Sequence, residues 1–365
     1  MGRTSLAVAL LCGLICGNVF AAQAGEEEEP EDQALRRGIA WLVEHQNEDG
    51  SWTAPVGFKL NQAYQAEEKS GPHVAVTAFA ALALLSRSGQ LDDQGQAALK
   101  RAGEFLIGCA DPLSGYISRG GTRMYGHALA TLFFAEAKGR LALAKSGEAL
   151  ERAVQFLVKT QNEQGGWRYE PFSPDTDLSV TACVLQALGA ARQRGVRVSQ
   201  ETFDQASDLL EKLYVTKEEP AYFMLDDEYY FLQSGSFRYQ DQENSRSSFA
   251  LTAAGLAAER ACGKELSERA ATPIVLDESY RRLAKHTSHY FYWYSQFHGV
   301  QALCRAGGEP WQRFQERSRA DMLRLVGPDG SWPNETGPGT AFATAIACLV
   351  LQAPNGGLTI LESGS

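Results

Sequence analysis

The chain has 365 residues, of which 44% are hydrophobic and 21% are charged, a balance that is typical of a folded globular protein. Its formal net charge is −10, and no cluster of lysine and arginine interrupts this acidic character. Polyanionic partners are attracted by basic patches, so the composition argues against nucleic acids and anionic membrane surfaces as partners.

Residues 1–24 have the pattern of a secretory signal. Arg3 provides a short basic start, residues 6–20 are apolar, and the small-x-small segment AQA at 22–24 fits a cleavage site. The pattern predicts a protein exported to the periplasm or the extracellular space, with no membrane span after the signal is removed. An uncleaved N-terminal anchor is the alternative. The acidic residues 25–32 are interpreted as a solvated leader without a function.

Two kinds of helical segment alternate after the leader, charged amphipathic segments and charge-poor segments rich in alanine, leucine and valine. Helices that are apolar nearly all round are buried, whereas amphipathic ones face water on one side. The alternation therefore predicts an all-α domain over 33–355 with buried helices inside amphipathic ones, followed by a tail at 356–365. The amphipathic segments are 33–46, 97–109, 149–161, 203–215, 269–286 and 311–326, and the charge-poor segments are 73–87, 125–138, 177–193, 247–262, 290–305 and 340–352.

An internal repeat runs through the outer segments. Residues 37–52, RGIAWLVEHQNEDGSW, and 152–167, RAVQFLVKTQNEQGGW, share basic, small, aromatic, Gln, Gly and Trp positions at the same spacing. A neutral amide, a glycine and an indole have little catalytic chemistry, so we interpret these positions as ties between adjacent helices. The repeat residues are Gln46, Gly50, Trp52, Gln161, Gly165, Trp167, Gly330 and Trp332. Residues 229–232 are either a short strand or a turn.

These residues resemble the QW motif of the squalene and oxidosqualene cyclases, whose helical repeats are shared with the β subunits of protein prenyltransferases. Segments 124–139 and 165–188 are similar to exported bacterial proteins with prenyltransferase/squalene-oxidase repeats. The resemblance implies an α/α toroid of about six inner and six outer helices, from the superfamily of terpenoid cyclases and protein prenyltransferases. It covers one toroid, about 30–355, whereas the hopene-forming cyclases have two helical domains.

Asp175 and Asp177 are the candidate catalytic residues that the resemblance implies. In squalene-hopene cyclases a DxDD motif places an acidic aspartate where it protonates a terminal alkene. The segment PDTDL at 174–178 keeps the first two aspartates and has Leu178 in place of the third. A second interpretation is that Asp177 is the N-cap of the helix that follows it.

Polar and aromatic side chains stand at the starts of several inner segments, which should gather at one end of the toroid. Convergent aromatic and polar groups are the usual composition of a ligand site, while core filling is the alternative for the same side chains. The candidate ligand-binding residues are His73, Tyr125, His127, Tyr290, Tyr292, Trp293 and His298.

No metal site or cofactor is predicted. The Asp-x-Cys element of the prenyltransferases does not occur, and His286 and His289 form the one histidine pair with metal-like spacing. The Gly-Cys-Gly-Glu-Gln thioester of the complement-type toroids is also missing, which excludes its acyl chemistry. The five cysteines after the signal fit buried free thiols better than a disulfide framework.

Three functions fit these observations, and whether the protein is an enzyme stays open at this point. The first is a non-catalytic toroid that binds an apolar or extended ligand, such as an isoprenoid, a glycan or a peptide partner. The second is a terpene-cyclase-like enzyme that protonates a polyprenyl substrate through Asp177, which would need a deep apolar cavity. The third is a carbohydrate-active enzyme similar to toroidal polysaccharide lyases.

Overall fold

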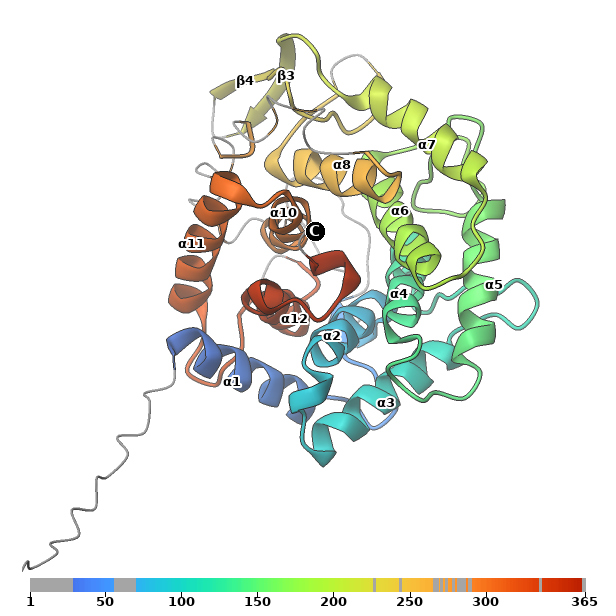
Figure 1. Ribbon diagram of the computed structural model, residues 1–365, viewed down its shortest axis with the longest axis vertical. Helices are drawn as coiled ribbons and strands as arrows, with labels where there is room; N and C mark the ends of the chain where they lie inside the picture. Colours follow the sequence, from blue (N-terminus) through green and yellow to red (C-terminus); the bar gives the residue numbers. More distant parts are fainter. Residues whose placement is uncertain are drawn as a thin grey trace, which may run out of the picture.

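The computed structural model describes residues 29–55, 70–225, 228–242, 245–264, 269, 272, 275–277, 280, 287, 291–334 and 337–362. Within them the helices form two concentric rings, as Figure 1 shows in a view down the shortest axis of the molecule. The predicted signal at 1–24 lies outside the described residues. The first helix begins at Pro30, within the predicted leader, because a proline at the start and two acidic residues in the first turn suit a helix N-terminus.

The inner ring consists of helices that are buried on all sides. Every one of the 13 residues of α2 is buried, which explains why its sequence, VAVTAFAALALLS, contains no charged residue. The inner helices are α2 (Val74–Ser86), α4 (Arg123–Ala137), α6 (Leu178–Gln193), α8 (Phe249–Ala261), α10 (Tyr292–Ala306) and α12 (Thr340–Gln352).

The outer helices each bury one face. In the helix Ser146–Lys159, Leu150, Val154 and Leu157 are buried, while Glu148 and Glu151 are exposed. This arrangement confirms the prediction of an all-α toroid with amphipathic helices outside. Most of the outer helix predicted at 269–286 lies outside the described residues. Within this range, the described residues 275–277 are helical. The other outer helices are α1 (Pro30–Glu44), α3 (Asp93–Gly108), α5 (Ser146–Lys159), α7 (Gln200–Leu213) and α11 (Gly308–Leu325).

The ring closes where the two ends of the helical sequence meet. The last inner helix, α12, packs against the first inner helix, α2, and also against α1 (Figure 1). A Cβ atom on Gly38 of α1 would lie 2.7 Å from both the Trp332 ring and Cys348 Sγ. Glycine at this position therefore allows the close approach that closes the ring.

The repeated Gln and Gly positions join neighbouring outer helices. The Gln46 amide donates hydrogen bonds to the carbonyls of Gly50 (3.0 Å) and of Ala98 on α3 (2.8 Å). Gln161 makes the equivalent pair of bonds to its own glycine and to α7. Gly165 has a φ of +87°, and a Cβ atom there would collide with the backbone of Gln205, so the turn requires glycine.

The tryptophans join each outer helix to an inner one. Trp52 Nε1 donates to the carbonyl of Leu42 (2.9 Å), and its backbone N–H donates to Thr77 Oγ1 on α2 (3.1 Å). Both hydrogen bonds recur at Trp167 and Trp332. Phe237, which has no indole, makes only the bond from its backbone N–H to a threonine. The four backbone N–H donors and their threonine acceptors are Trp52 and Thr77, Trp167 and Thr181, Phe237 and Thr252, and Trp332 and Thr344.

Two short antiparallel hairpins interrupt the helices. The strands β1 (Thr53–Pro55) and β2 (Ser70–Pro72) form one, and β3 (Glu219–Leu225) and β4 (Glu228–Leu232) form the other. Residues 229–232 are therefore strand rather than turn. The other three strands carry no alternation that the sequence analysis could use.

Residues 353–362, which we name the C-terminal strap, lie across one end of the inner ring (Figure 1). The buried Glu136 carboxylate at the end of α4 accepts hydrogen bonds from Thr359 N (3.0 Å), Thr359 Oγ1 (2.5 Å) and Ile360 N (3.2 Å). Arg140 donates to the carbonyl of Gly357 (2.5 Å). The strap therefore covers the end of the ring at which the inner helices finish.

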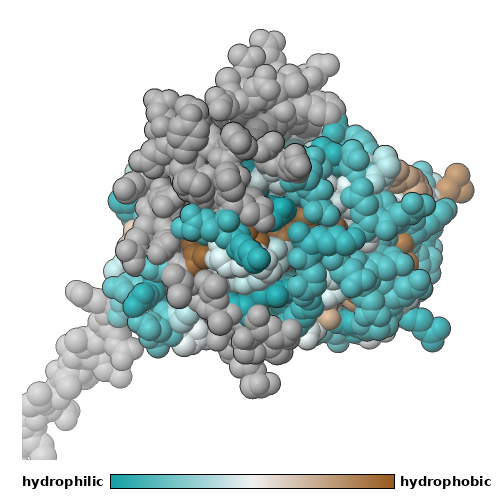
Figure 2. All heavy atoms as spheres, turned by 90° about the horizontal axis from the view of Figure 1, so that it is seen from above, coloured by the Kyte–Doolittle hydropathy of each residue, from teal (hydrophilic) through white to brown (hydrophobic). Residues whose placement is uncertain are grey.

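Figure 2 shows one face of the molecule, on which the described surface is mainly hydrophilic with small hydrophobic areas. Among the described residues, no helix has the length and hydropathy needed to cross a membrane.

Candidate functional site

The two ends of the inner ring differ. The strap covers the end at which α2, α4 and α10 finish, through contacts with Ser86, Glu136 and Cys304. At the opposite end the same helices begin, and side chains from helices that are not neighbours in the ring meet there. We place the candidate site at this second end, around the start of α6.

Asp177 lies directly before α6, and its side chain is 0% exposed. Its Oδ1 atom accepts hydrogen bonds from the Val180 N–H (2.9 Å) and the Ser179 hydroxyl (2.6 Å), which is the N-cap arrangement. Its Oδ2 atom accepts no hydrogen bond of normal geometry from the described residues, and Arg168 Nε lies 4.0 Å away. One oxygen therefore caps the helix while the other is left as a buried acceptor.

The electrostatic surroundings favour the protonated form of this group. Burial raises the pKa of Asp177 above its ordinary value. The hydrogen bonds from Ser179 and the Val180 N–H, the charge of Arg168 and the nearby Tyr239 hydroxyl act in the opposite direction. A raised pKa makes the protonated form of this carboxyl group, which can donate a proton or a hydrogen bond, more accessible than it is for an exposed aspartate.

Four partly buried tyrosines surround Asp177, and we name them the tyrosine cluster: Tyr125, Tyr169, Tyr239 and Tyr294. The Tyr125 hydroxyl donates to Ser179 Oγ (2.6 Å), and the Tyr294 hydroxyl donates to the Ser179 carbonyl (2.8 Å). The hydroxyls of Tyr169 and Tyr239 lie 2.7 Å apart. Burial raises the pKa of each of these phenols, so all four are neutral hydrogen-bonding groups at physiological pH.

Two arginines lie at the edge of the tyrosine cluster. Arg168 forms an ion pair with the exposed Asp175 (2.9 Å) and packs over the Tyr169 ring. The Arg246 guanidinium lies 4.8 Å from the centre of the Tyr239 ring. Asp175 therefore neutralises a rim arginine and has no place in the buried acid group.

The interior of the inner ring is filled by side chains. Phe79 on α2 contacts Phe297 on α10, with ring centres 4.8 Å apart, although α12 lies between these helices in the ring. Deeper than the tyrosine cluster, His298 lies 2.8 Å from the Gln186 amide and 3.9 Å from Cys183 Sγ. Burial lowers the pKa of His298 to about 3 and raises that of Cys183 to about 12, so this layer is uncharged.

The candidate ligand-binding residues separate into two groups. Tyr125 and His298 lie in or beside the tyrosine cluster. His127 does not, because its ring is wedged between α4 and α5, where it bonds to the Ile117 N–H (3.0 Å) and the Ala153 carbonyl (3.2 Å). His73 caps α2 by accepting from the Val76 N–H, and burial lowers its pKa to about 4.

The aromatic residues near the start of α10 (residues 290–294) also separate into residues that reach the site and residues that do not. Tyr292 and Trp293 are buried. The Tyr292 hydroxyl donates to Asp321 on the outer helix α11 (3.2 Å), so Tyr292 faces away from the candidate site, and Trp293 packs against the Tyr292 ring. Tyr290 lies outside the described residues, as do His286 and His289. Tyr294, which ends the same run, is the residue that reaches the site.

Three residues of the tyrosine cluster, Tyr169, Tyr239 and Tyr294, were not among the candidates, and for the first two the sequence contains a signal. Tyr169 follows Trp167 in the segment GGWRY, and Tyr239 follows Phe237 in the segment GSFRY. The two segments are copies of one turn, so each tyrosine stands at the same place before an inner helix. Aligning the turns beyond their aromatic position would have paired them.

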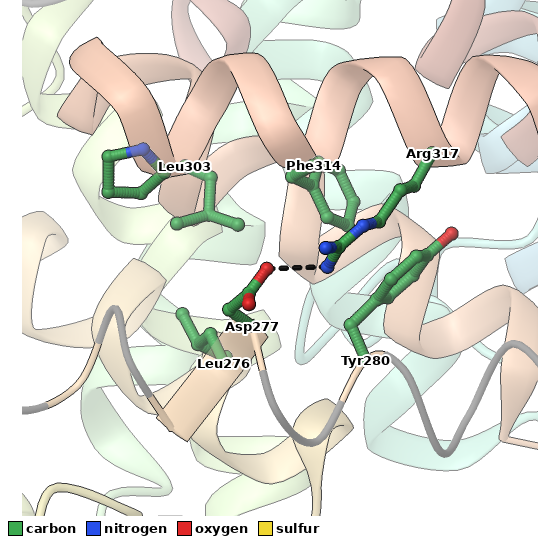
Figure 3. A pocket seen from close by; sticks show the side chains of 7 residues that line it. Leu276, Asp277, Tyr280, Leu303, Phe314 and Arg317 are labelled. Carbon is green, nitrogen blue, oxygen red and sulfur yellow. Dashed lines mark hydrogen bonds and ion pairs between the residues drawn. The ribbon is translucent and has the colours of Figure 1, made fainter.

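No group of three or more His, Cys, Asp or Glu side chains that could hold a metal ion occurs in the described part of the chain. Figure 3 shows a small pocket away from the site, between α10, α11 and the residues Leu276, Asp277 and Tyr280, where Asp277 pairs with Arg317 (2.5 Å). A second small pocket lies beside the strap, against Thr359 and Ile360. Neither pocket includes Asp177.

Comparison with known proteins places this geometry among the α/α toroids. The family model of the A-macroglobulin TED domain matches residues 16–169, which is less than half of the chain. The chain has no Gly-Cys-Gly-Glu-Gln segment, so the match concerns the fold. No curated protein matches the chain.

Solved structures with the same fold include three with different chemistry. The type II terpene cyclase MstE from Scytonema is 16% identical with a TM-score of 0.56, and 91% of this chain covers 100% of that one. Cellobiose 2-epimerase from Spirochaeta thermophila is 12% identical with a TM-score of 0.59, and 89% of this chain covers 95% of that one.

The third is an inactive variant of an α-1,6-mannanase from Salegentibacter in complex with α-1,6-mannotriose. It is 8% identical with a TM-score of 0.57, and 91% of this chain covers 100% of that one. At these identities the likeness establishes the α/α toroid fold, and the function has to be argued from the site.

Proposed function

We propose that the tyrosine cluster binds an extended, hydroxyl-rich ligand of the carbohydrate class, with Asp177 at the floor of the site. The observation that supports this most strongly is the convergence of four partly buried tyrosines on a buried carboxylic acid, at the end of the ring that the strap leaves uncovered. A sugar ring offers both an apolar face for an aromatic ring and hydroxyls for hydrogen bonds.

The character of the site favours a sugar over a polyprenyl chain. A polyprenyl ligand needs a deep apolar cavity, whereas here the rings of Tyr125 and Tyr294 meet across the interior from opposite helices, and Tyr294 reaches from α10 to Ser179 on α6. The tyrosine hydroxyls and the two rim arginines make the opening polar.

Charge considerations point to a neutral ligand. The chain has a formal net charge of −10, and Arg168 is already paired with Asp175. An anionic polysaccharide would meet an acidic protein with few unpaired cations at this end. Two of the similar toroids are described as acting on, or binding, neutral saccharides, which agrees with this choice. Export through residues 1–24 would bring the protein to such ligands, and we propose that location with the function.

Proton transfer to a polyprenyl substrate is a second candidate, supported by the state of Asp177. Its burial and its raised pKa are features that an alkene-protonating acid requires, and its Oδ2 atom makes no hydrogen bond of normal geometry within the described residues. In that reaction the O–H bond of Asp177 breaks, a C–H bond forms on the alkene, and the resulting cation closes a ring. The cation then loses a proton to solvent, and the Asp177 carboxylate regains one from solvent. The product is an isomer of the substrate and needs no co-reactant.

One set of measurements separates the two. We expect isothermal titration calorimetry to detect binding of α-1,6-mannotriose or cellobiose, and the variants Tyr125→Phe and Tyr239→Phe to weaken it by about tenfold, the effect of one lost hydrogen bond in a desolvated site. Tyr116→Phe, outside the cluster, is the matched control. Conversion of geranylgeraniol to an isomer of equal mass, abolished in Asp177→Asn, would instead establish the second function.

A further inference from the structure

Phe172 combines two unfavourable features. Its side chain is 59% exposed, and its φ of +60° lies in the left-handed region that residues with a Cβ atom rarely adopt. Non-glycine residues held in this conformation cluster at functional sites. Its ring makes an edge-to-face contact with Phe156 on α5, with ring centres 6.0 Å apart, and more than half of the Phe172 side chain still faces solvent.

The loop that carries Phe172 is the wall of the candidate site. It runs from Trp167 to Asp177 and contains Arg168 and Tyr169, so it joins the repeat turn to the start of α6. Three residues of extended chain span at most about 10 Å, so the Cα atoms of Phe172 and Tyr169 lie no farther apart than that.

Hydrogen bonds hold this loop on both sides of Phe172. The Met124 N–H donates to the Tyr169 carbonyl (3.1 Å), and Arg123 pairs with Glu170 (2.9 Å). The Asn162 side chain donates to the carbonyls of Ser173 (3.0 Å) and Asp175 (2.9 Å). The anchored flanks fix the left-handed residue between them, so the ring projects outward from a rigid base.

We propose that Phe172 is a second aromatic subsite, which stacks on a sugar unit beyond those held by the tyrosine cluster and so selects an oligosaccharide longer than three units. This inference rests on the proposed carbohydrate function. Stacking on a ligand would supply free energy that offsets the cost of exposing an aromatic ring on a left-handed backbone. The Lys159 ammonium lies over the ring, 6.0 Å from its centre, and 59% of the Phe172 side chain stays exposed for contact with a ligand.

The test compares α-1,6-mannohexaose with α-1,6-mannotriose by calorimetry. Phe172→Gly should lower the affinity for the hexaose about tenfold and leave that for the triose unchanged, because one stacking contact is lost. The same change should raise the Tm by about 2 °C, because glycine adopts positive φ without strain. Phe172→Trp should retain the affinity for the hexaose.

Lys145→Gly is the matched control. Lys145 is exposed with a φ of +65° at the start of α5, about 20 Å along that helix from Lys159. The substitution Lys145→Gly should raise the Tm by a similar amount and leave the affinity for the hexaose unchanged. An unchanged affinity of Phe172→Gly for the hexaose, when the wild type binds it, would overturn the subsite and leave the proposed function standing. A wild type that binds neither sugar would overturn the proposed function and the subsite together.

Discussion

Tyr125 on α4 and Tyr294 on α10 meet with ring centres 6.4 Å apart, although their helices stand on opposite sides of the inner ring. Both hydroxyls donate to Ser179, the residue that also donates to Asp177. The buried acid is thus linked to three inner helices through one serine. The predictions below test this linkage, the turns that build the ring and the strap that covers its other end.

Replacement of Asp177 should separate its two roles. Asp177→Asn keeps an oxygen that can cap α6, so we expect a change in the free energy of unfolding within about 1 kcal/mol. Asp177→Ala loses the cap and should cost about 1–2 kcal/mol. Urea unfolding of the two variants measures both numbers. Equal losses in the two variants would show that the cap contributes nothing.

The raised pKa of Asp177 has a consequence for the pH dependence of stability. The folded state holds this proton more tightly than the unfolded state, so the contribution is full below the ordinary value near 3.8 and is lost as pH rises through the raised value. Asp177→Asn should therefore gain stability relative to the wild type as pH rises from about 4 toward neutral. A difference that stays constant over this range would contradict the raised pKa of Asp177.

The buried histidines should dominate acid unfolding. Burial lowers the pKa of His127 and His298 to about 3, so each stays neutral in the folded state and gains a proton on unfolding below about 6.5. Their contribution is full above 6.5 and should fall by about 2 kcal/mol for each histidine by pH 5. His298→Gln should reduce the slope of unfolding free energy against pH by one proton below pH 6.5, and a slope equal to that of the wild type would contradict this account.

The four repeat turns should respond alike to the loss of their threonine acceptor. Thr77→Val, Thr181→Val, Thr252→Val and Thr344→Val each leave a buried backbone N–H without a partner, at a cost of about 1–3 kcal/mol. Chemical denaturation of the four variants checks this. A cost confined to one or two of them would show that the turns are not equivalent.

The strap should depend on Glu136. Glu136→Gln replaces an acceptor of three hydrogen bonds with a group that accepts through one oxygen only, so the amides of Thr359 and Ile360 should exchange with deuterium at least tenfold faster. The exposed Glu148→Gln on α5 is the control. Unchanged exchange at both amides would mean that the strap is held by its apolar side chains alone.

The rings of helices were predictable because burial leaves a direct trace in composition and period. Apolar helices such as α2 contain no charged residue, whereas amphipathic helices such as α5 carry charged residues on one face along their length. The alternation of the two kinds along the sequence indicates the toroid. The hairpins were mostly missed because strands of three residues, such as Thr53–Pro55, are too short for an alternating pattern.

The site was predicted only in part, for a related reason. A helix buried on all sides has no polar face, so its pattern does not say which residues point to the centre of the ring. His127 and Tyr125 stand two positions apart, yet one faces α5 and the other faces Ser179. Asp177 was identified because a motif marks it, whereas Tyr169 and Tyr239 needed the alignment of two turns.

Hydrogen–deuterium exchange of the full chain with and without α-1,6-mannohexaose tests the central claim most directly. The account predicts protection confined to the loop at 168–177, to residues 238–242 and to the start of α10, all of which surround Asp177. Protection that appears instead at the strap or beside the Asp277 pocket, or no protection at a saturating concentration of the sugar, would contradict it.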